Sequence, residues 1–295
     1  MDSDPHIVLR SHACTAASAF LRALPTGERA MVHASYRAAV RRRMLLPSVQ
    51  DDAPADECTC GAPTATLDSE HAFGCTQNSA LTVRRHDETA ATLREVLTES
   101  GVSSTLEPLV RSLFSGAGAA GRNMQGAAAD ALRARRAARA ARAGQARGDV
   151  LCVMDRALHV IDVVWVHPAG QAQRRAASRS AGAAASDADG RKRTQYRRLV
   201  GLDGYKLVPF SVETHGRLGR PAMQLLNKLG HLAEQRSRGL LRHAQFVERA
   251  LQRFAALGVE WNARMEAHTA GNLALAPGRE YLPGDAVPPA DVGEE

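Results

Sequence analysis

The chain has 295 residues, which is enough for one large domain or two smaller ones. Its net charge of +7 favours a polyanionic partner, because Lys and Arg near phosphates release counterions and bind nucleic acid without regard to its sequence. No apolar run is long enough for a membrane-spanning helix, and residues 1–10 lack the form of a signal peptide. We therefore expect an intracellular protein, nuclear or cytoplasmic, that is not secreted and has no membrane partner.

Helical patterns occupy the first fifty residues. Apolar residues recur at helical intervals between residues 16 and 24, and the Pro-Thr-Gly sequence that follows is typical of a helix end. We expect a second helix over residues 28–45. An acidic, proline-containing stretch at residues 50–57 indicates a linker, so residues 1–50 are assigned to an N-terminal helical segment.

Three of the five cysteines gather with one histidine in the next segment, residues 51–80. The four residues are Cys58, Cys60, His71 and Cys75. Two or more thiolates with an imidazole suit the tetrahedral coordination of zinc, and four filled positions make such a zinc structural. The odd number of cysteines argues against a disulfide framework and for a reducing compartment. The alternative is a group of incidental thiols beside a surface histidine.

Helices and strands alternate over residues 81–260. Residues 84–100 form an amphipathic pattern with His86, Ala90, Leu93 and Leu97 on one face, and Gly101 is typical of a helix stop. We expect strands at 104–110, 149–154, 158–167 and 205–214, and helices at 191–200, 221–235 and 240–257.

Two compositionally biased segments interrupt this α/β pattern, at residues 115–148 and 170–190. The first is rich in Ala, Gly and Arg, and we interpret it as an insertion. The second is rich in Ala and Ser, and we expect a loop. Residues 261–295 are assigned to a disordered tail because of their proline-rich, acidic end. The fold class is therefore α/β, with a mixed sheet flanked by helices.

Carboxylates lie where two strands of this sheet are expected to meet. Asp162 stands in the middle of an apolar strand, and a buried carboxylate requires a partner or a metal. Asp149 opens the preceding strand, and Glu107 lies on an earlier one. Hard oxygen ligands of this kind suit Mg²⁺, which can activate water and neutralise charge at a phosphate. The alternative for Asp162 is a hydrogen-bonded residue of the core.

A basic helix is expected after these strands, and it offers a cation for the same site. Lys192 is the candidate to lie near a scissile phosphate. The arginines around it are candidates for nucleic-acid binding: Arg191, Arg193, Arg197 and Arg198. A basic run of this kind is also typical of a solvated helix face.

Several short sequences carry a resemblance to a known family. ECTCG, HAFGC, VRRHDETAATLREVL, RGDV, VIDVVWVHP, KRTQY and PFSVETHG occur in the order seen downstream of reverse transcriptase in some non-LTR retrotransposon proteins. In that region a Cys-Cys-His-Cys zinc knuckle precedes a restriction-enzyme-like endonuclease of the PD-(D/E)xK type. The resemblance covers roughly residues 14–230, apart from the two biased segments.

The resemblance implies a fold, a site and an activity. It implies a restriction-endonuclease-like sheet, with zinc bound by Cys58, Cys60, His71 and Cys75. It also implies Asp149 and Asp162 as the metal-binding acids. The residue two positions after Asp162 is Val164, so the lysine of the motif would be Lys192, displaced onto a helix.

Three functions follow as hypotheses. The first is a Mg²⁺-dependent endonuclease that hydrolyses DNA, with RNA as the other nucleic-acid partner considered. The second is a catalytically inactive, nucleic-acid-binding remnant of the same fold. The third is a zinc-stabilised scaffold without a nucleic-acid role, which binding insensitive to salt would favour.

Overall fold

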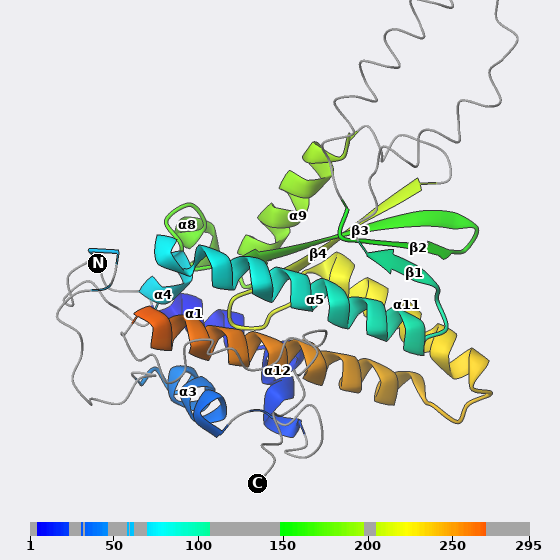
Figure 1. The fold of residues 1–295 in the computed structure, drawn as a ribbon, viewed down its shortest axis with the longest axis horizontal. Helices are drawn as coiled ribbons and strands as arrows, with labels where there is room; N and C mark the ends of the chain where they lie inside the picture. Colours follow the sequence, from blue (N-terminus) through cyan, green and yellow to red (C-terminus); the bar gives the residue numbers. More distant parts are fainter. Residues whose placement is uncertain are drawn as a thin grey trace, which may run out of the picture.

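The computed structural model describes residues 5–23, 31, 33–46, 58, 60–61, 70–106, 148–197 and 205–269. Over these residues the chain is a mixed α/β structure with a four-stranded sheet flanked by helices (Figure 1). This coarse fold class is the one expected. Glu107, Arg198 and the biased segment at 115–147 lie outside the described residues, as does the end of the first expected strand.

The sheet is mixed, with strand order β1-β2-β3-β4. Its strands are β1 (Ser104–Leu106), β2 (Val150–Met154), β3 (Ala157–Val166) and β4 (Tyr205–Glu213). The first three pair antiparallel, whereas β4 runs parallel to β3 and therefore needs a crossover between them. The described strands thus agree closely with the expected ones.

Helices cover both faces of the sheet. The crossover from β3 to β4 contains α8 (Arg174–Ala177) and α9 (Ala183–Gln195), and α9 packs on both strands. The other face is covered by α5 (Ser79–Glu99) and α11 (Arg220–Arg236), which also contact each other. Gly101 ends the α5 region with φ +77°, the left-handed conformation that its position required.

The alternation of β3 separates these two faces. Ile161 and Val163 belong to the main core beneath α5 and α11. Val160 packs with Tyr196, and Val164 packs with the alanines of α9, so the even-numbered residues face that helix. Asp162 is therefore placed on the α9 side of the central strand.

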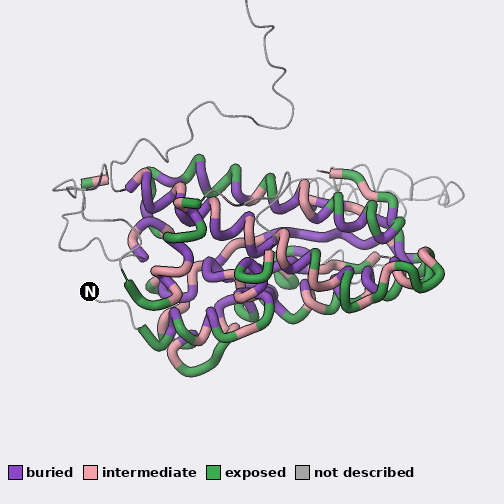
Figure 2. The backbone as a smooth tube through the Cα atoms, turned by 90° about the horizontal axis from the view of Figure 1, so that it is seen from below, coloured by how far each residue is buried: buried purple, intermediate pink, exposed green. Residues whose placement is uncertain are grey.

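A long helix, α12 (His243–Thr269), lies outside α5 and α11 and joins them to the N-terminal region (Figure 1). Its other neighbours are shorter helices, namely α2 (Thr15–Ser18), η1 (Ala19–Arg22), α3 (His33–Arg43), α4 (His71–Gly74) and η3 (Thr76–Asn78). The first helix, α1 (Pro5–His12), packs on α2 and α3. Figure 2 shows the buried segments running through the middle of the molecule, with exposed segments along the outer turns of the helices.

One continuous core joins these layers. Leu93 and Leu97 of α5 are fully buried, and Phe210 of β4 contacts Phe254 of α12 with ring centroids 5.0 Å apart. Phe20 from the N-terminal region belongs to the same cluster. The expected face of the amphipathic helix is confirmed for Ala90, Leu93 and Leu97, which belong to this core, whereas His86 is partly exposed and lies outside it.

Two expectations from composition are wrong. Residues 170–190 are not a loop, because α8 and the first half of α9 form there. Alanine favours helix, and Ala184, Ala185 and Ala188 make a narrow face that is buried against the sheet. Residues 261–269 are not part of a disordered tail, since α12 continues through them with Trp261 and Met265 buried beside Leu81.

Candidate functional site

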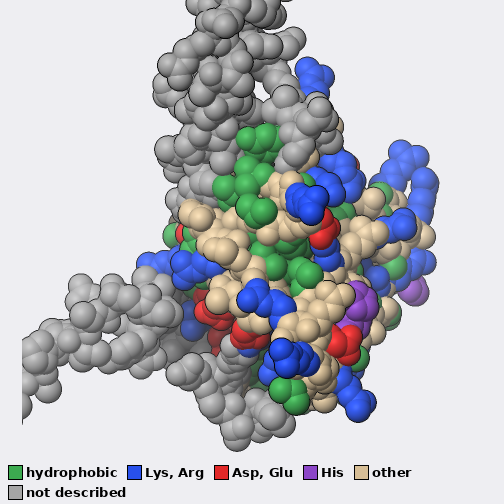
Figure 3. All heavy atoms as spheres, turned by 90° about the vertical axis from the view of Figure 1, so that its right-hand side faces the viewer, with side chains coloured by type: hydrophobic (Ala, Val, Ile, Leu, Met, Phe, Trp, Pro, Cys, Tyr) green, Lys and Arg blue, Asp and Glu red, His purple; other side chains and the backbone are tan. Residues whose placement is uncertain are grey.

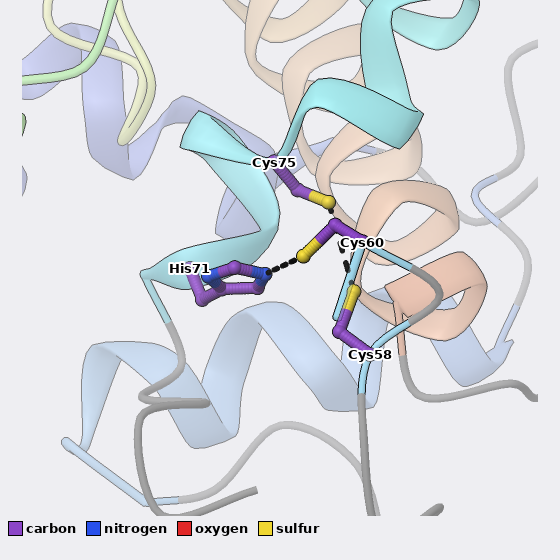
Figure 4. A group of neighbouring side chains, drawn as sticks. All are labelled: Cys58, Cys60, His71 and Cys75. Carbon is purple, nitrogen blue, oxygen red and sulfur yellow. Dashed lines mark hydrogen bonds between the residues drawn. The ribbon is translucent and has the colours of Figure 1, made fainter. Parts of the chain in front are cut away.

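The four expected zinc ligands come together in space. The ligand atoms of Cys58, Cys60, His71 and Cys75 all lie within 4.8 Å of one another. The Sγ atoms of Cys58 and Cys75 are 3.6 Å apart, and Sγ of Cys60 is 3.4 Å from Nε2 of His71 (Figure 4). Tetrahedral zinc with bonds of about 2.0–2.3 Å would separate its ligands by about 3.3–3.8 Å. The geometry is therefore compatible with a zinc site.

Local backbone structure places these ligands. Gly61 has φ +82°, and its amide donates to the carbonyl of Cys58 over 2.7 Å, which turns the chain back after Cys60. His71 begins the single turn of α4, and Cys75 follows in an extended conformation. A tight turn on one side and a helical turn on the other thus aim four side chains at one point.

The pKa values of two of these thiols are shifted in opposite directions. Burial opposes ionisation of Cys58, but hydrogen bonds from the Cys60 backbone and from His71 lower its pKa to about 7. Burial raises the pKa of Cys75 to about 11, and the nearby Cys58 acts in the same direction. Cys58 is therefore the more readily ionised of these two thiols, and a thiolate is the form of cysteine that binds a metal.

A second site is formed where β2 meets β3. Asp149 immediately precedes β2, whose first residue pairs with Ile161, and its own amide donates to the Ile161 carbonyl over 3.0 Å. The Asp149 carboxylate turns over β3, where Oδ2 accepts from the amide of Val163 over 2.6 Å. Asp149 is thus held beside the middle of the strand that carries Asp162.

Asp162 and Lys192 form a largely buried ion pair in this site. Lys192 of α9 donates from Nζ to Oδ1 of Asp162 over 2.8 Å, and the side chains are 22% and 3% exposed. Oδ2 of Asp162 is buried and accepts no hydrogen bond at normal geometry from any residue that the structure describes. The two carboxylates and the lysine expected from the sequence therefore lie together, although Glu107 lies outside the described residues.

Burial sets the electrostatics of Asp162. It raises the pKa of this carboxyl, and the charge of Asp149 acts in the same direction, whereas Lys192 and Tyr196 act in the opposite one. Burial also raises the pKa of Tyr196, and Asp162 adds to that effect. The environment of Asp162 therefore disfavours its charged form on balance, and a nearby cation would favour that form.

His86 contributes a contact to this site that the sequence analysis did not assign. Its Nε2 atom lies 3.1 Å from Oδ2 of Asp149, so α5 reaches the site from the other face of the sheet. The hydrogen bond to Asp149 raises the pKa of His86 to about 9, although burial opposes this. The sequence did not predict this contact, because His86 shares a helix face with apolar residues.

The basic residues of α9 lie at the edge of this site. Arg191, Arg193 and Arg197 are exposed, and Arg191 is paired with Asp187 one turn earlier in the helix. On the end of the molecule shown in Figure 3, Lys and Arg side chains predominate over Asp and Glu among the coloured atoms. These side chains are therefore available to solvent and to an anionic ligand.

Glu213, from the quoted sequence PFSVETHG, has a structural role. It is buried at the end of β4, where Oε2 accepts from the hydroxyl of Ser11 over 2.5 Å. Its other oxygen accepts from the amide of Ala185 at 3.4 Å. Glu213 therefore ties the N-terminal helix α1 and the start of α9 to the sheet.

Comparison with known proteins adds no identification. No protein-family model matches the chain, and no curated protein matches it significantly. None of the described helices is both long enough and apolar enough to cross a membrane.

Proposed function

We propose that this protein is a metal-dependent endonuclease that hydrolyses phosphodiester bonds in DNA. The observation that carries the proposal is the meeting of Asp149, Asp162 and Lys192 at one point of the sheet. Asp162 is paired with Lys192, and the nearby charge of Asp149 acts on it; two acids and a lysine so placed can hold a metal and stabilise a phosphate during hydrolysis.

The architecture supports a restriction-endonuclease-like fold for this site. A helix precedes three antiparallel strands, and a crossover helix leads to a fourth, parallel strand. The acids come from β3 and from the residue before β2, and Lys192 comes from the crossover helix α9. This is the displaced lysine that the resemblance to the retrotransposon proteins implies.

Asp149 and Asp162 would hold the Mg²⁺ ion. The donor set fits, because both are carboxylates, and the buried Asp162 lies beside Asp149 with Lys192 and Tyr196 as its hydrogen-bonding neighbours. When bound, such an ion lowers the pKa of a water ligand and neutralises charge on the phosphate. The hydrogen bonds from Val163 and His86 orient the Asp149 carboxylate for this role.

Lys192 would stabilise the charge that develops on the phosphate. Its Nζ atom is fixed by Asp162, yet the side chain keeps enough exposure to meet a substrate at the site. A preorganised cation beside a developing oxyanion lowers the barrier without reorganisation during the reaction. The ion pair with Asp162 would therefore hold the Lys192 ammonium group in place for the phosphate.

DNA would be gripped mainly through its phosphates. Arg193 is exposed on the helix that carries Lys192, and Arg197 is exposed just beyond its end, so phosphate contacts there would lead the backbone toward the acids. RNA remains the second substrate to be compared.

One observation favours an inactive, nucleic-acid-binding remnant as the second candidate. Asp149 is already engaged by Val163 and His86, and Asp162 by Lys192, so both acids have partners without a metal. A fold that kept these contacts would persist after its chemistry was lost. Binding of DNA without cleavage would identify this case.

The test is nicking of supercoiled plasmid by the purified protein with Mg²⁺ or Mn²⁺. Asp162→Asn should abolish nicking, whereas Asp189→Asn changes a different buried aspartate, on α9, which hydrogen-bonds to Ser211, and should retain it. Nicking that persists in Asp162→Asn would exclude this centre. Binding without nicking by the wild-type protein would favour the remnant.

A further inference from the structure

A second group of metal-ligand side chains lies apart from both sites described above. Glu70, His167 and His215 place one ligand atom each within 4.8 Å of one another, and all three side chains are buried or nearly so. Glu70 precedes α4, His167 follows β3, and His215 follows β4. Three segments that are distant in sequence thus converge at the carboxyl ends of the two parallel strands.

The distances within this group match those of ligands around one ion. Nε2 of His215 lies 3.1 Å from Oε2 of Glu70, and Nε2 of His167 lies 3.6 Å from the same oxygen. Bonds of about 2.0–2.1 Å in a tetrahedron would separate ligand atoms by about 3.3–3.4 Å. Small movements of two rings would therefore place all three atoms around one metal.

We propose that Glu70, His167 and His215 bind a second zinc ion, separate from the one held by the cysteines. Two imidazoles and one carboxylate form a ligand set that zinc takes in proteins. Arg42 lies near this group, but its guanidinium is paired with Glu266 in a buried ion pair, which offsets its charge. Arg85 and Arg174 also act on His167, and buried Arg85 donates to the neutral Asn262, so the Glu70 carboxylate is the ligand that offsets positive charge at this site.

A fourth ligand is available next to the three. His12 is buried, its ring centroid lies 4.8 Å from that of His215, and neither ring nitrogen has a partner among the described residues. A cavity of about 20 Å³ lined by His12, Arg42 and His215 adjoins it. This volume is about that of one water molecule, so the fourth position falls to His12 or to a water.

The position of this zinc gives it a structural function. Glu70 and His71 are consecutive residues, so the two ions would be joined through a single peptide. The cysteine-bound ion closes the zinc module on itself, whereas the second ion would fasten that module to β3 and β4. The module would then be held at a fixed place relative to Asp162 on β3.

Zinc content of the full-length protein tests this proposal. We expect two zinc ions per chain in the wild type and one in each of His167→Ala and His215→Ala. His159→Ala should retain two, because His159 is buried on the same strand but contacts only the Ala157 carbonyl among the interactions described. Asp162→Asn should also retain two, which excludes zinc held by the carboxylates of the other site.

Absorption spectra of the cobalt-substituted wild-type protein provide a second test of the proposal, and this test needs no variant. Thiolate ligands produce an intense charge-transfer absorption on Co²⁺, whereas a site of two histidines and a glutamate produces only weaker ligand-field bands. We expect two Co²⁺ equivalents in the wild-type protein, one of them without thiolate absorption. A single equivalent that carries thiolate absorption would overturn the proposal, and Glu70 would then be hydrogen-bonded to the two histidines alone.

Discussion

Asp162→Asn is expected to stabilise the Mg²⁺-free protein while it abolishes nicking. The side chain of Asp162 is 3% exposed, so its ionised carboxylate has lost most of its hydration. That loss costs several kcal/mol for an ion in a protein interior. The ion pair with Lys192 at 2.8 Å recovers about 4–6 kcal/mol at an effective dielectric constant of about 20. The two contributions are therefore of similar size.

The direction of the pKa shift decides the balance. The pKa of Asp162 is raised, chiefly by burial and further by Asp149, so the folded protein binds this proton more tightly than the unfolded chain does. Ionisation therefore costs stability as the pH rises from about 3.9, and the full cost is present above the folded-state pKa. An asparagine carries no charge and keeps an oxygen that can accept from Lys192. We expect a gain of about 1 kcal/mol, or about 2–4 °C in melting temperature.

Thermal unfolding with and without Mg²⁺ is the assay, in buffer without chelator so that the cysteine cluster keeps its zinc. Mg²⁺ at ten times its dissociation constant should stabilise the wild type by about 1.4 kcal/mol and leave Asp162→Asn unchanged. Asp189→Asn is the matched control, because Asp189 is also buried and its pKa is also raised by burial, but it lies beside Ser211. It should keep both the response to Mg²⁺ and the nicking activity.

The opposite result would refute the reasoning. If Asp162 were a structural residue of the core, its substitution would break a buried ion pair and lower stability by about 3–5 kcal/mol. The wild-type protein would then show no response to Mg²⁺. A large loss of stability together with no metal effect would remove Asp162 from the catalytic site.

Four further predictions follow from the same contacts. Lys192→Met should lower the rate of nicking by about 10²–10³-fold in a plasmid assay, with partial recovery in Lys192→Arg, and an unchanged rate would remove Lys192 from the mechanism. The pKa of His86 is raised to about 9 by Asp149, so the stability from this contact is complete below about pH 6.5 and is lost as the pH rises through 9. Urea unfolding across that range should show this loss in the wild type and not in His86→Gln; parallel curves would contradict it. Cys58→Ser should release one zinc ion and destabilise the protein by several kcal/mol, and metal analysis that still finds this zinc would exclude Cys58 as a ligand. Arg193→Ala should weaken DNA binding and reduce the slope of log K against log salt by about 1, whereas an unchanged slope would place Arg193 away from the phosphates.

The sequence was most informative where chemistry and spacing coincide. Cys58, Cys60, His71 and Cys75 are few and clustered, so their convergence followed from ligand type alone. The apolar run around Asp162 identified the central strand, because a strand covered on both faces carries no alternation. Lys192 is the predicted cation for this site because of its place in a basic helix, but its contact with Asp162 was not predicted, since no rule of spacing links a helix to a strand across a crossover.

Other features were concealed by composition or by distance in sequence. The alanine-rich sequence of α9 is typical of a low-complexity loop. It forms a helix here because Ala184 and Ala188 pack against the sheet. His86 reaches Asp149 across 63 residues, and Glu70 reaches His215 across 145. Such contacts depend on how the whole chain folds, which local patterns do not encode.

The long helix α12 has a consequence for the order in which the chain folds. It has 27 residues and extends about 40 Å, and its Glu248 pairs with Arg22 across 226 positions of sequence. Leu81 of α5 is buried against its Trp261 and Met265, so the surface beside the zinc module is covered only once α12 has been made. During synthesis this apolar surface of the earlier elements stays exposed to solvent. Contacts between residues so far apart in sequence also form slowly. The nascent chain is therefore expected to stay a client of chaperones until α12 has left the ribosome.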